Sequence, residues 1–208
     1  MKIAVLGGTG WIGSHIVAEA RARGLEVVVL TRRPDQGPAD SVETRQLDIT
    51  DPDANLNDAL RGCDALIATI GGRAEGNHAV VPQAAAILLN TSIPRLLWVG
   101  GAGSLEVAPG VPLITTPDFP DAFKDEAQAQ GEALEVFRAS SSAVNWTFIS
   151  PAADIFPGEP LGHYRIGGDT LLTDEQGLCR ISVTDYAAAV LDELAEGTHS
   201  QQRIGVAY

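Results

Sequence analysis

Glycines recur at a regular spacing near the start of the chain, in the stretch VLGGTGWIGSHI. Gly7, Gly10 and Gly13 fit the pattern GxxGxxG, and Gly8 with Gly10 and Gly13 also fits GxGxxG. In such a loop one glycine makes a tight turn, one lets a pyrophosphate approach the backbone, and one lets the next helix pack on the strand. The N–H groups at the start of that helix then attract phosphate oxygens.

The glycine stretch therefore predicts dinucleotide binding, with a purely structural glycine turn as the alternative. The apolar run KIAVL precedes it and a helical pattern follows it, which is the context that the motif requires. The residues expected to contact the cofactor here are Gly7, Thr9, Gly10, Trp11, Ile12 and Gly13.

Two arginines stand at the end of the second apolar run, in VVVLTRRP. When such a site binds NAD, an acidic residue at this place accepts hydrogen bonds from the 2′-hydroxyl group of the adenine ribose. This chain has Thr31, Arg32 and Arg33 instead, and guanidinium groups bind a 2′-phosphate through bidentate contacts. We therefore expect NADP(H) to be preferred over NAD(H), with Arg32 nearer to the strand end. The alternative is that both arginines are solvated loop charges.

More candidate residues follow the other apolar runs. Asp48 and Ile49 close the third run, where an acid can hold the adenine amino group and an apolar side chain can cover the ring. For Asp48, a helix cap or a loop turn is an equal alternative. Small residues after the fourth and sixth runs would let a ligand approach the backbone. The residues expected beside the cofactor there are Ile70, Gly71, Gly72, Pro151 and Ala152.

Strand patterns alternate with helical patterns along the chain. Strands are expected at 2–8, 26–31, 42–50, 64–72, 95–101 and 145–151, and helices at 11–24, 55–62, 78–90 and 123–140. This alternation predicts an α/β fold, a Rossmann-type doubly wound parallel sheet with helices on both faces. Ligands of such sheets bind beyond the carboxyl ends of the strands, where the candidate residues lie.

The alternation stops after Pro151. Turn signals at 167–169 and 174–177 predict that residues 151–182 form short strands or hairpins, a small C-terminal substrate lobe or lid over the crevice. Phe156, His163 and Tyr164 belong to this lobe, where packing is favoured over stacking on a ligand. Ser182 and Asp185 fit a capping box for a further helix. We expect residues 1–208 to form a single domain.

The chain is acidic, with 14 lysines and arginines against 27 aspartates and glutamates and a formal net charge of −13. This balance disfavours nucleic acids and anionic membranes as partners. The apolar runs are too short to span a bilayer, and the start of the chain does not fit a signal peptide. Cys63 and Cys179 form no CxxC pair, and no histidine has a partner at metal-ligand spacing. We expect a cytoplasmic monomer or homodimer without a metal.

Several long motifs together resemble the atypical short-chain dehydrogenase/reductase superfamily. They are GGTGWIGSHI, LDITD, VGGAGSLEVAPG, TPDFP, WTFISPAA, GHYRIGGD and RISVTDYAAAVLDEL, and they cover nearly the whole chain. More narrowly, the chain is similar to small NAD(P)H–flavin reductases related to biliverdin-reductase-B-like and NmrA-like NAD(P)-binding proteins. The resemblance implies a Rossmann fold, a nicotinamide cofactor, and hydride transfer to a flavin (FMN, FAD or riboflavin) or another flat acceptor such as a quinone.

The chain departs from the superfamily at its usual catalytic pair, Tyr-x-x-x-Lys at the start of the long helix. Phe123 is followed four residues later by Ala127, and the other register gives Lys124 and Gln128. Carbonyl reduction needs such a phenol as an acid, whereas hydride transfer to a flavin mainly needs stacked rings. Two weaker candidates for catalysis are Ser104, by hydrogen bonding to a substrate carbonyl, and Lys124, by its charge.

Two other functions are compatible with this pattern. One is a regulatory protein that senses NADP(H) without turnover. The other is an NAD(P)-dependent epimerase or dehydratase, which the missing tyrosine disfavours. The fold alone does not decide between these alternatives.

Overall fold

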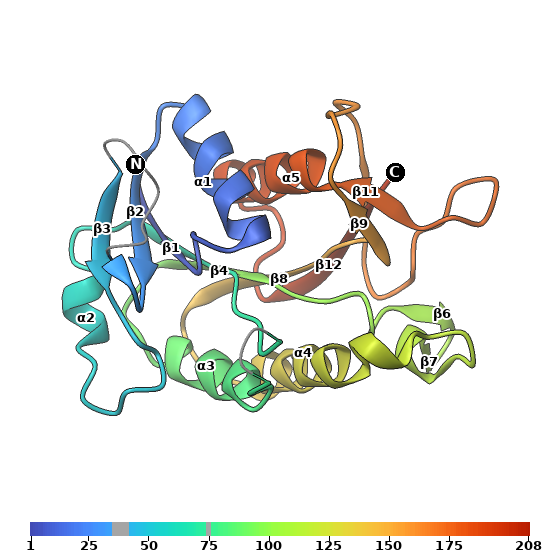
Figure 1. Ribbon diagram of the computed structural model, residues 1–208, viewed down its shortest axis with the longest axis horizontal. Coiled ribbons are helices and arrows are strands. Elements are labelled where there is room, and N and C mark those ends of the chain that lie inside the picture. Colours follow the sequence, from blue (N-terminus) through green and yellow to red (C-terminus); the bar gives the residue numbers. More distant parts are fainter. Residues whose placement is uncertain (35–41, 74–75) are drawn as a thin grey trace.

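A computed structural model describes residues 1–34, 42–73 and 76–208. Within this part of the chain, eight strands form one sheet in the order β3-β2-β1-β4-β5-β8-β12-β10 (Figure 1). Their bounds are β1 Lys2–Leu6, β2 Glu26–Thr31, β3 Glu43–Gln46, β4 Ala65–Ala68, β5 Arg95–Val99, β8 Asn145–Ser150, β10 Arg165–Gly167 and β12 Gln202–Ala207. All pairings are parallel except that of β10 with β12.

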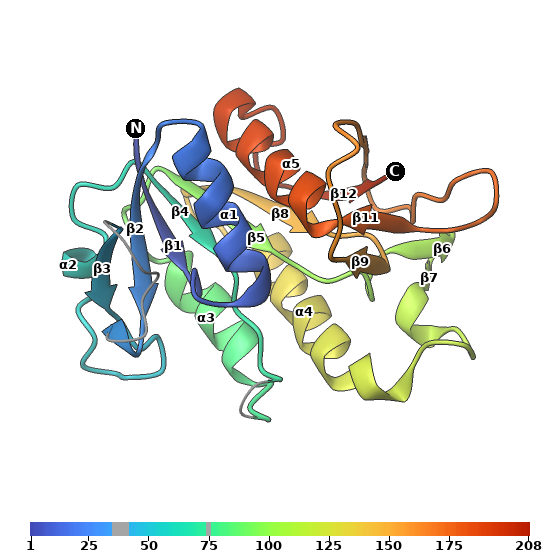
Figure 2. The ribbon, with the colours of Figure 1, turned by 45° about the horizontal axis from the view of Figure 1, so that its top comes forward.

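Helices cover both faces of the sheet (Figure 1). Helices α1 (Trp11–Ala22) and α5 (Val183–Glu196) lie side by side on one face, as Figure 2 also shows. Helices α3 (Val80–Leu88) and α4 (Asp121–Ala139) pack together on the other face, and the short α2 (Leu56–Ala59) lies near β3. The predicted Rossmann-type α/β fold is therefore confirmed.

The alternation of side chains along β1 explains why the sheet has two cores. Ile3 and Val5 pack into the core beneath α1 and α5, whereas Ala4 and Leu6 pack into the core beneath α3 and α4. Successive side chains of a strand point to opposite faces, so a strand covered on both faces must be apolar at nearly every position. The uninterrupted apolar runs of the sequence reflect this double burial.

Short elements lie outside the alternation, and in residues 151–182 they include short strands, one of the two forms that the sequence predicts. The long connection between β5 and α4 contains the strands β6 (Glu106–Ala108) and β7 (Val111–Pro112) and the 3₁₀ helix η2 (Leu113–Thr115). Within residues 151–182, β9 (Asp154–Phe156) pairs in parallel with β11 (Arg180–Ser182), and β10 joins the edge of the main sheet. The segment is therefore not a set of hairpins, because its strands pair with partners distant in sequence.

Helix α5 is fastened at its start by the predicted cap. The Asp185 N–H donates to the Ser182 hydroxyl oxygen over 3.0 Å. The box is not completed, since the Ser182 N–H donates to the Tyr208 hydroxyl oxygen over 3.1 Å, and the Asp185 carboxylate accepts from the Leu161 and Gly162 N–H groups at 2.7 and 3.1 Å. The cap thus also ties the loop before β10 to the start of α5.

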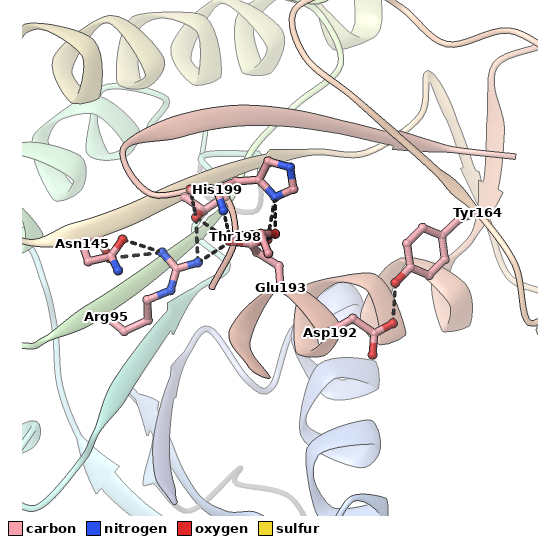
Figure 3. Close-up of polar contacts among 8 residues, drawn as sticks. Arg95, Asn145, Tyr164, Asp192, Glu193, Thr198 and His199 are labelled. Atoms are coloured by element: carbon pink, nitrogen blue, oxygen red, sulfur yellow. Dashed lines mark hydrogen bonds and ion pairs between the residues drawn. The ribbon is translucent and has the colours of Figure 1, made fainter. Parts of the chain in front are cut away.

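A buried ionic cluster fastens the end of α5 to the sheet (Figure 3). The Glu193 carboxylate, 2% exposed as a residue, accepts from Arg95 Nη2 at 2.6 Å and lies 2.7 Å from His199 Nδ1. Nearby, the Tyr164 hydroxyl donates to Asp192, which also pairs with Arg23, the C-cap residue of α1. No helix in the described part of the chain is long and apolar enough to cross a membrane.

Candidate functional site

The glycine loop joins β1 to α1 at the carboxyl edge of the sheet. Gly7 has φ of +80°, a conformation that favours glycine, and its N–H donates to the Leu30 oxygen over 3.2 Å. A Cβ on Gly13 would lie 2.2 Å from the carbonyl oxygen of Gly7. Only glycine therefore allows this contact between the helix and the strand end, as the motif requires.

The start of α1 is open and free of negative charge. Gly10 is the N-cap residue, no side chain caps it, and the first turn of this fully described helix contains no acidic residue. Thr9, Gly10 and Trp11 are exposed, and Ile12 is half-buried. The first N–H groups of a helix lack partners within the helix, so this end suits an anion such as a pyrophosphate.

Arg32 and Arg33 lie exposed just beyond the end of β2. The backbone there is ordered by neighbours, since the Arg33 N–H donates to the Thr31 hydroxyl oxygen over 3.2 Å and the Leu47 N–H donates to the Thr31 carbonyl oxygen over 2.9 Å. The second contact places the end of β3 beside the end of β2. Both arginines are thus at the edge of the sheet that carries the glycine loop.

Asp48 follows β3 and faces the same corner. Its carboxylate accepts hydrogen bonds from the Thr50 hydroxyl and N–H groups at 2.6 and 2.9 Å, which makes the loop turn that was one of its two expected roles. These bonds, and to a smaller degree the charge of Arg32, lower the pKa of Asp48. Ile49 is partly buried against the core. Contact of Asp48 and Ile49 with an adenine stays a prediction.

The loop after β4 is held by side chains that the sequence did not single out. The Gly72 N–H donates to Glu126 Oε2 over 2.9 Å, and the Ile70 carbonyl oxygen accepts from Gln130 Nε2 over 2.9 Å. Gly71 packs so closely that a Cβ there would lie 2.9 Å from Glu126 Oε1. The sequence shows only that Glu126 and Gln130 are polar residues four apart on a helix, and the structure shows that this side of α4 meets the loop.

The two catalytic candidates occupy different places. Lys124 is about half exposed and its Nζ pairs with Asp121 Oδ1 at 2.6 Å. Ser104 lies near Gly131, since a Cβ added to Gly131 would be 3.9 Å from the Ser104 Cβ. Gly131 is about 10 Å further along α4 than Lys124. The structure does not bring them together. Gln128 lies exposed and hydrogen-bonds to Glu132, so the Lys124–Gln128 register faces solvent.

All three tyrosines of the chain are engaged in hydrogen bonds to protein groups. The Tyr186 hydroxyl, fully buried, donates to the Ile149 oxygen over 2.7 Å, and the Tyr208 hydroxyl donates to Asp185 over 2.5 Å. Tyr164 donates to Asp192. Burial raises the pKa of each phenol, and carboxylate partners raise the pKa of Tyr164 and Tyr208 further. A phenol that acts as an acid near neutral pH needs the opposite shift.

The residues directly after β8 are buried, whereas most residues of the lobe are exposed and make a few aromatic contacts. Pro151 and Ala152, which directly follow the end of β8, are buried. The Phe156 ring lies beneath the Arg180 guanidinium group, 4.7 Å from its centre, and beside Tyr208. The ring of His163 also lies near Tyr208. These contacts agree with the packing role favoured for the lobe aromatics.

Three histidines contact a backbone carbonyl oxygen or a carboxylate of the protein. His15 Nδ1 lies 2.8 Å from the Trp11 carbonyl oxygen, His78 pairs with Glu126, and His199 pairs with Glu193. Over residues 1–34, 42–73 and 76–208, no group of three or more histidine, cysteine or acidic side chains could hold a metal ion.

Comparisons with known proteins agree with this geometry. The model of the NAD(P)H-binding family matches residues 7–194. The Bacillus subtilis protein YwnB is 36% identical and covers 99% of this chain and 98% of its own. A Burkholderia pseudomallei structure, named provisionally an exported protein, is 40% identical with a TM-score of 0.90 over the full length of both chains.

Two further solved structures carry names of enzymes. One, from Streptococcus pneumoniae, is named provisionally an NADH-flavin reductase; it is 34% identical, with a TM-score of 0.89 over 100% of this chain and 99% of that chain. The other, from Bacteroides thetaiotaomicron, is named provisionally an epimerase; it is also 34% identical, with a TM-score of 0.89 over 100% and 96%.

The fold and the open glycine loop define an NAD(P)-binding protein like the atypical short-chain dehydrogenases and reductases. The chain belongs to the NAD(P)H-binding family.

Proposed function

We propose that this protein is an NADPH-dependent reductase that passes hydride from the nicotinamide to a flavin or a similar flat acceptor such as a quinone. The observation that carries the proposal combines groups that suit NADP(H) at the carboxyl edge of the sheet with the engagement of every tyrosine hydroxyl by a protein group. The open glycine loop and Arg32 with Arg33 suit NADP(H), while all three tyrosines have protein partners. A reaction that needs no phenolic acid fits this edge best.

The described residues fit the cofactor. The close packing of Gly13 on Gly7 sets the start of α1 against the strand end, the uncapped start of α1 suits a pyrophosphate, and the two arginines suit a 2′-phosphate. Ile70, Gly71 and Gly72 would lie beside the nicotinamide half, together with Pro151 and Ala152 after β8. When bound, NADPH supplies the hydride.

The chain's own contribution to the reaction is orientation and exclusion of water. Phe123, about half exposed with the Arg73 guanidinium group 5.4 Å from its ring centre, offers an aromatic surface near the loop after β4. Residues 151–182 would act as the lid of the single domain over the crevice, fixed to α5 through Asp185. Hydride transfer between stacked rings depends on such positioning, and water can supply the remaining proton.

The family and the S. pneumoniae relative support this assignment. The name of the B. thetaiotaomicron relative favours a second candidate, an NAD(P)-dependent epimerase or dehydratase. A third is an NADP(H) sensor without turnover.

A panel of acceptors separates the reductase from the other two candidates, because neither of them consumes NADPH with a flavin or a quinone. Purified protein would be given NADPH with FMN, with a quinone or with a simple aldehyde, and absorbance of the reduced nicotinamide would be followed. We expect oxidation with FMN or the quinone and none with the aldehyde, because no phenolic acid is free. Reduction of the aldehyde alone would overturn the proposal in favour of carbonyl chemistry.

A further inference from the structure

The loop after β4 lies directly against the glycine loop. The Thr69 N–H and hydroxyl groups both donate to the Leu6 carbonyl oxygen, at 2.8 and 3.0 Å. A Cβ on Gly7 would lie 2.5 Å from Thr69 Oγ1. A ligand that follows the glycine loop across the sheet edge therefore next meets the backbone of Ile70–Gly72.

Two side chains of α4 hold that backbone from the other side. Glu126 Oε2 accepts from the Gly72 N–H at 2.9 Å, and Gln130 Nε2 donates to the Ile70 oxygen at 2.9 Å. Gln130 is itself fixed, because its Oε1 accepts from Trp98 Nε1 of β5 at 3.0 Å. The superfamily places its tyrosine and lysine four residues apart on this helix, and here a pair with the same spacing binds the loop.

Gly72 also packs closely against the residues that follow it. A Cβ on Gly72 would lie 2.5 Å from His78 Cα and 2.6 Å from the Asn77 oxygen. His78 Nδ1 lies 3.0 Å from the same Glu126 oxygen that accepts from Gly72. The Glu126 side chain is 13% exposed, so its charge depends on these donors for compensation. Without the carboxylate, the Gly72 N–H would lose its partner.

We infer that Glu126 is a positioning residue for dinucleotide binding. It fixes the Ile70–Gly72 backbone in the shape that the nicotinamide half requires, and it acts as a hydrogen-bond acceptor rather than as an acid or base. The inference rests on the proposed function only in that a dinucleotide binds along this edge. We therefore expect substitution of Glu126 to change the affinity for the cofactor and not the rate of hydride transfer.

The test compares Glu126→Ala with Glu126→Gln, which keeps an oxygen able to accept from Gly72. The dissociation constant of NADPH would be measured by calorimetry, and kcat and KM by turnover with FMN. Loss of one backbone-orienting hydrogen bond predicts about tenfold weaker NADPH binding for Glu126→Ala. For Glu126→Gln we expect binding within about threefold of wild type, and for both variants a kcat at saturating NADPH within about twofold.

Controls separate positioning from general damage. Glu132→Ala, on the exposed side of the same helix, should bind NADPH as the wild type does. Should Glu126→Ala fail to fold, Glu126→Asp replaces it, because the shorter carboxylate does not reach Gly72. Wild-type affinity in a folded Glu126→Ala or Glu126→Asp protein would overturn the inference, as would equal losses in Glu126→Gln and Glu126→Ala. A fall in kcat with unchanged affinity would also overturn it.

The two proposals fail in different experiments. If wild-type protein binds NADPH but reduces no flavin or quinone, the reductase proposal fails while the affinity series still tests Glu126. If wild-type protein turns over and Glu126→Ala binds NADPH normally, only the positioning role fails.

Discussion

At the scale of single residues, the glycine loop and the arginine corner, formed by Arg32 and Arg33, are the features that the sequence predicts most directly. Their chemistry depends on residue type and local spacing, as with Gly7, Gly13, Arg32 and Arg33. The roles of Glu126 and Gln130 depend on which helix face meets the loop after β4, and spacing along the chain does not determine that. The engagement of all three tyrosines likewise becomes visible only in three dimensions.

The arginine corner makes a prediction about cofactor choice. Arg32→Ala combined with Arg33→Ala removes the groups expected to bind the 2′-phosphate, which NADH lacks. Loss of charge-assisted hydrogen bonds predicts NADPH binding weaker by about 10- to 100-fold, with NADH binding changed by less than about threefold. Titration calorimetry with both dinucleotides measures this. Arg61→Ala, exposed and paired with Asp58, is the control, and equal losses for NADPH and NADH would refute the assignment.

The third glycine of the loop makes a prediction about packing. In Gly13→Ala, the new methyl group would lie 2.2 Å from the Gly7 oxygen, so the helix and loop must move apart. We expect the free energy of unfolding to fall by about 1–3 kcal/mol and dinucleotide binding to be lost. Thermal melting and NADPH titration check this against Gly168→Ala, where no atom lies within 4 Å of the added Cβ. A Gly13→Ala protein that binds NADPH normally would contradict the account.

At the scale of elements, the long strands and helices follow from apolar periodicity, and the short strands do not. β1, β2, β4 and β5 are mainly apolar runs buried on both faces, and β8 is buried along most of its length although Thr147 and Ser150 are polar. β10 carries only three residues, and it is a strand because β12 lies beside it. β9 depends on β11 in the same way. Such pairings are set by tertiary contacts, so local pattern did not reveal them.

The buried cluster at the end of α5 makes a prediction about stability. Glu193→Ala leaves Arg95 buried without its carboxylate partner, and such a loss typically costs about 3–5 kcal/mol. Urea unfolding measures this, with Glu196→Ala on the exposed end of the same helix as the control. A loss no larger for Glu193→Ala than for Glu196→Ala would show that the cluster does not hold α5.

The same cluster makes a prediction about pH. Burial alone would raise the pKa of Glu193, but hydrogen bonds from His199 and the charge of Arg95 outweigh it, so the pKa lies below its ordinary value of 4.5. A depressed pKa in the folded state stabilises the protein above the ordinary pKa, and this contribution disappears as the pH falls through the folded pKa. Unfolding free energy should therefore fall less steeply in acid for Glu193→Gln than for wild type. Identical acid dependence would contradict this.

At the scale of the whole molecule, the alternation of strand and helix patterns predicted the α/β class, which the structure confirms, whereas ligand binding at the carboxyl edge of the sheet stays a prediction. Parallel pairing brings the carboxyl ends of β1, β2 and β4 to one edge of the sheet, so residues far apart in the sequence lie close to that edge. The net charge of −13 makes the positive corner at Arg32 and Arg33 a local feature within a negative protein. The identity of the acceptor does not follow from the fold.

The central claim is most directly tested by the rate at which the purified protein oxidises NADPH and NADH, each with and without added FMN. We predict turnover that requires FMN and is faster with NADPH at limiting cofactor. Tight binding of NADPH with no turnover on FMN or a quinone would contradict the reductase assignment and indicate a sensor.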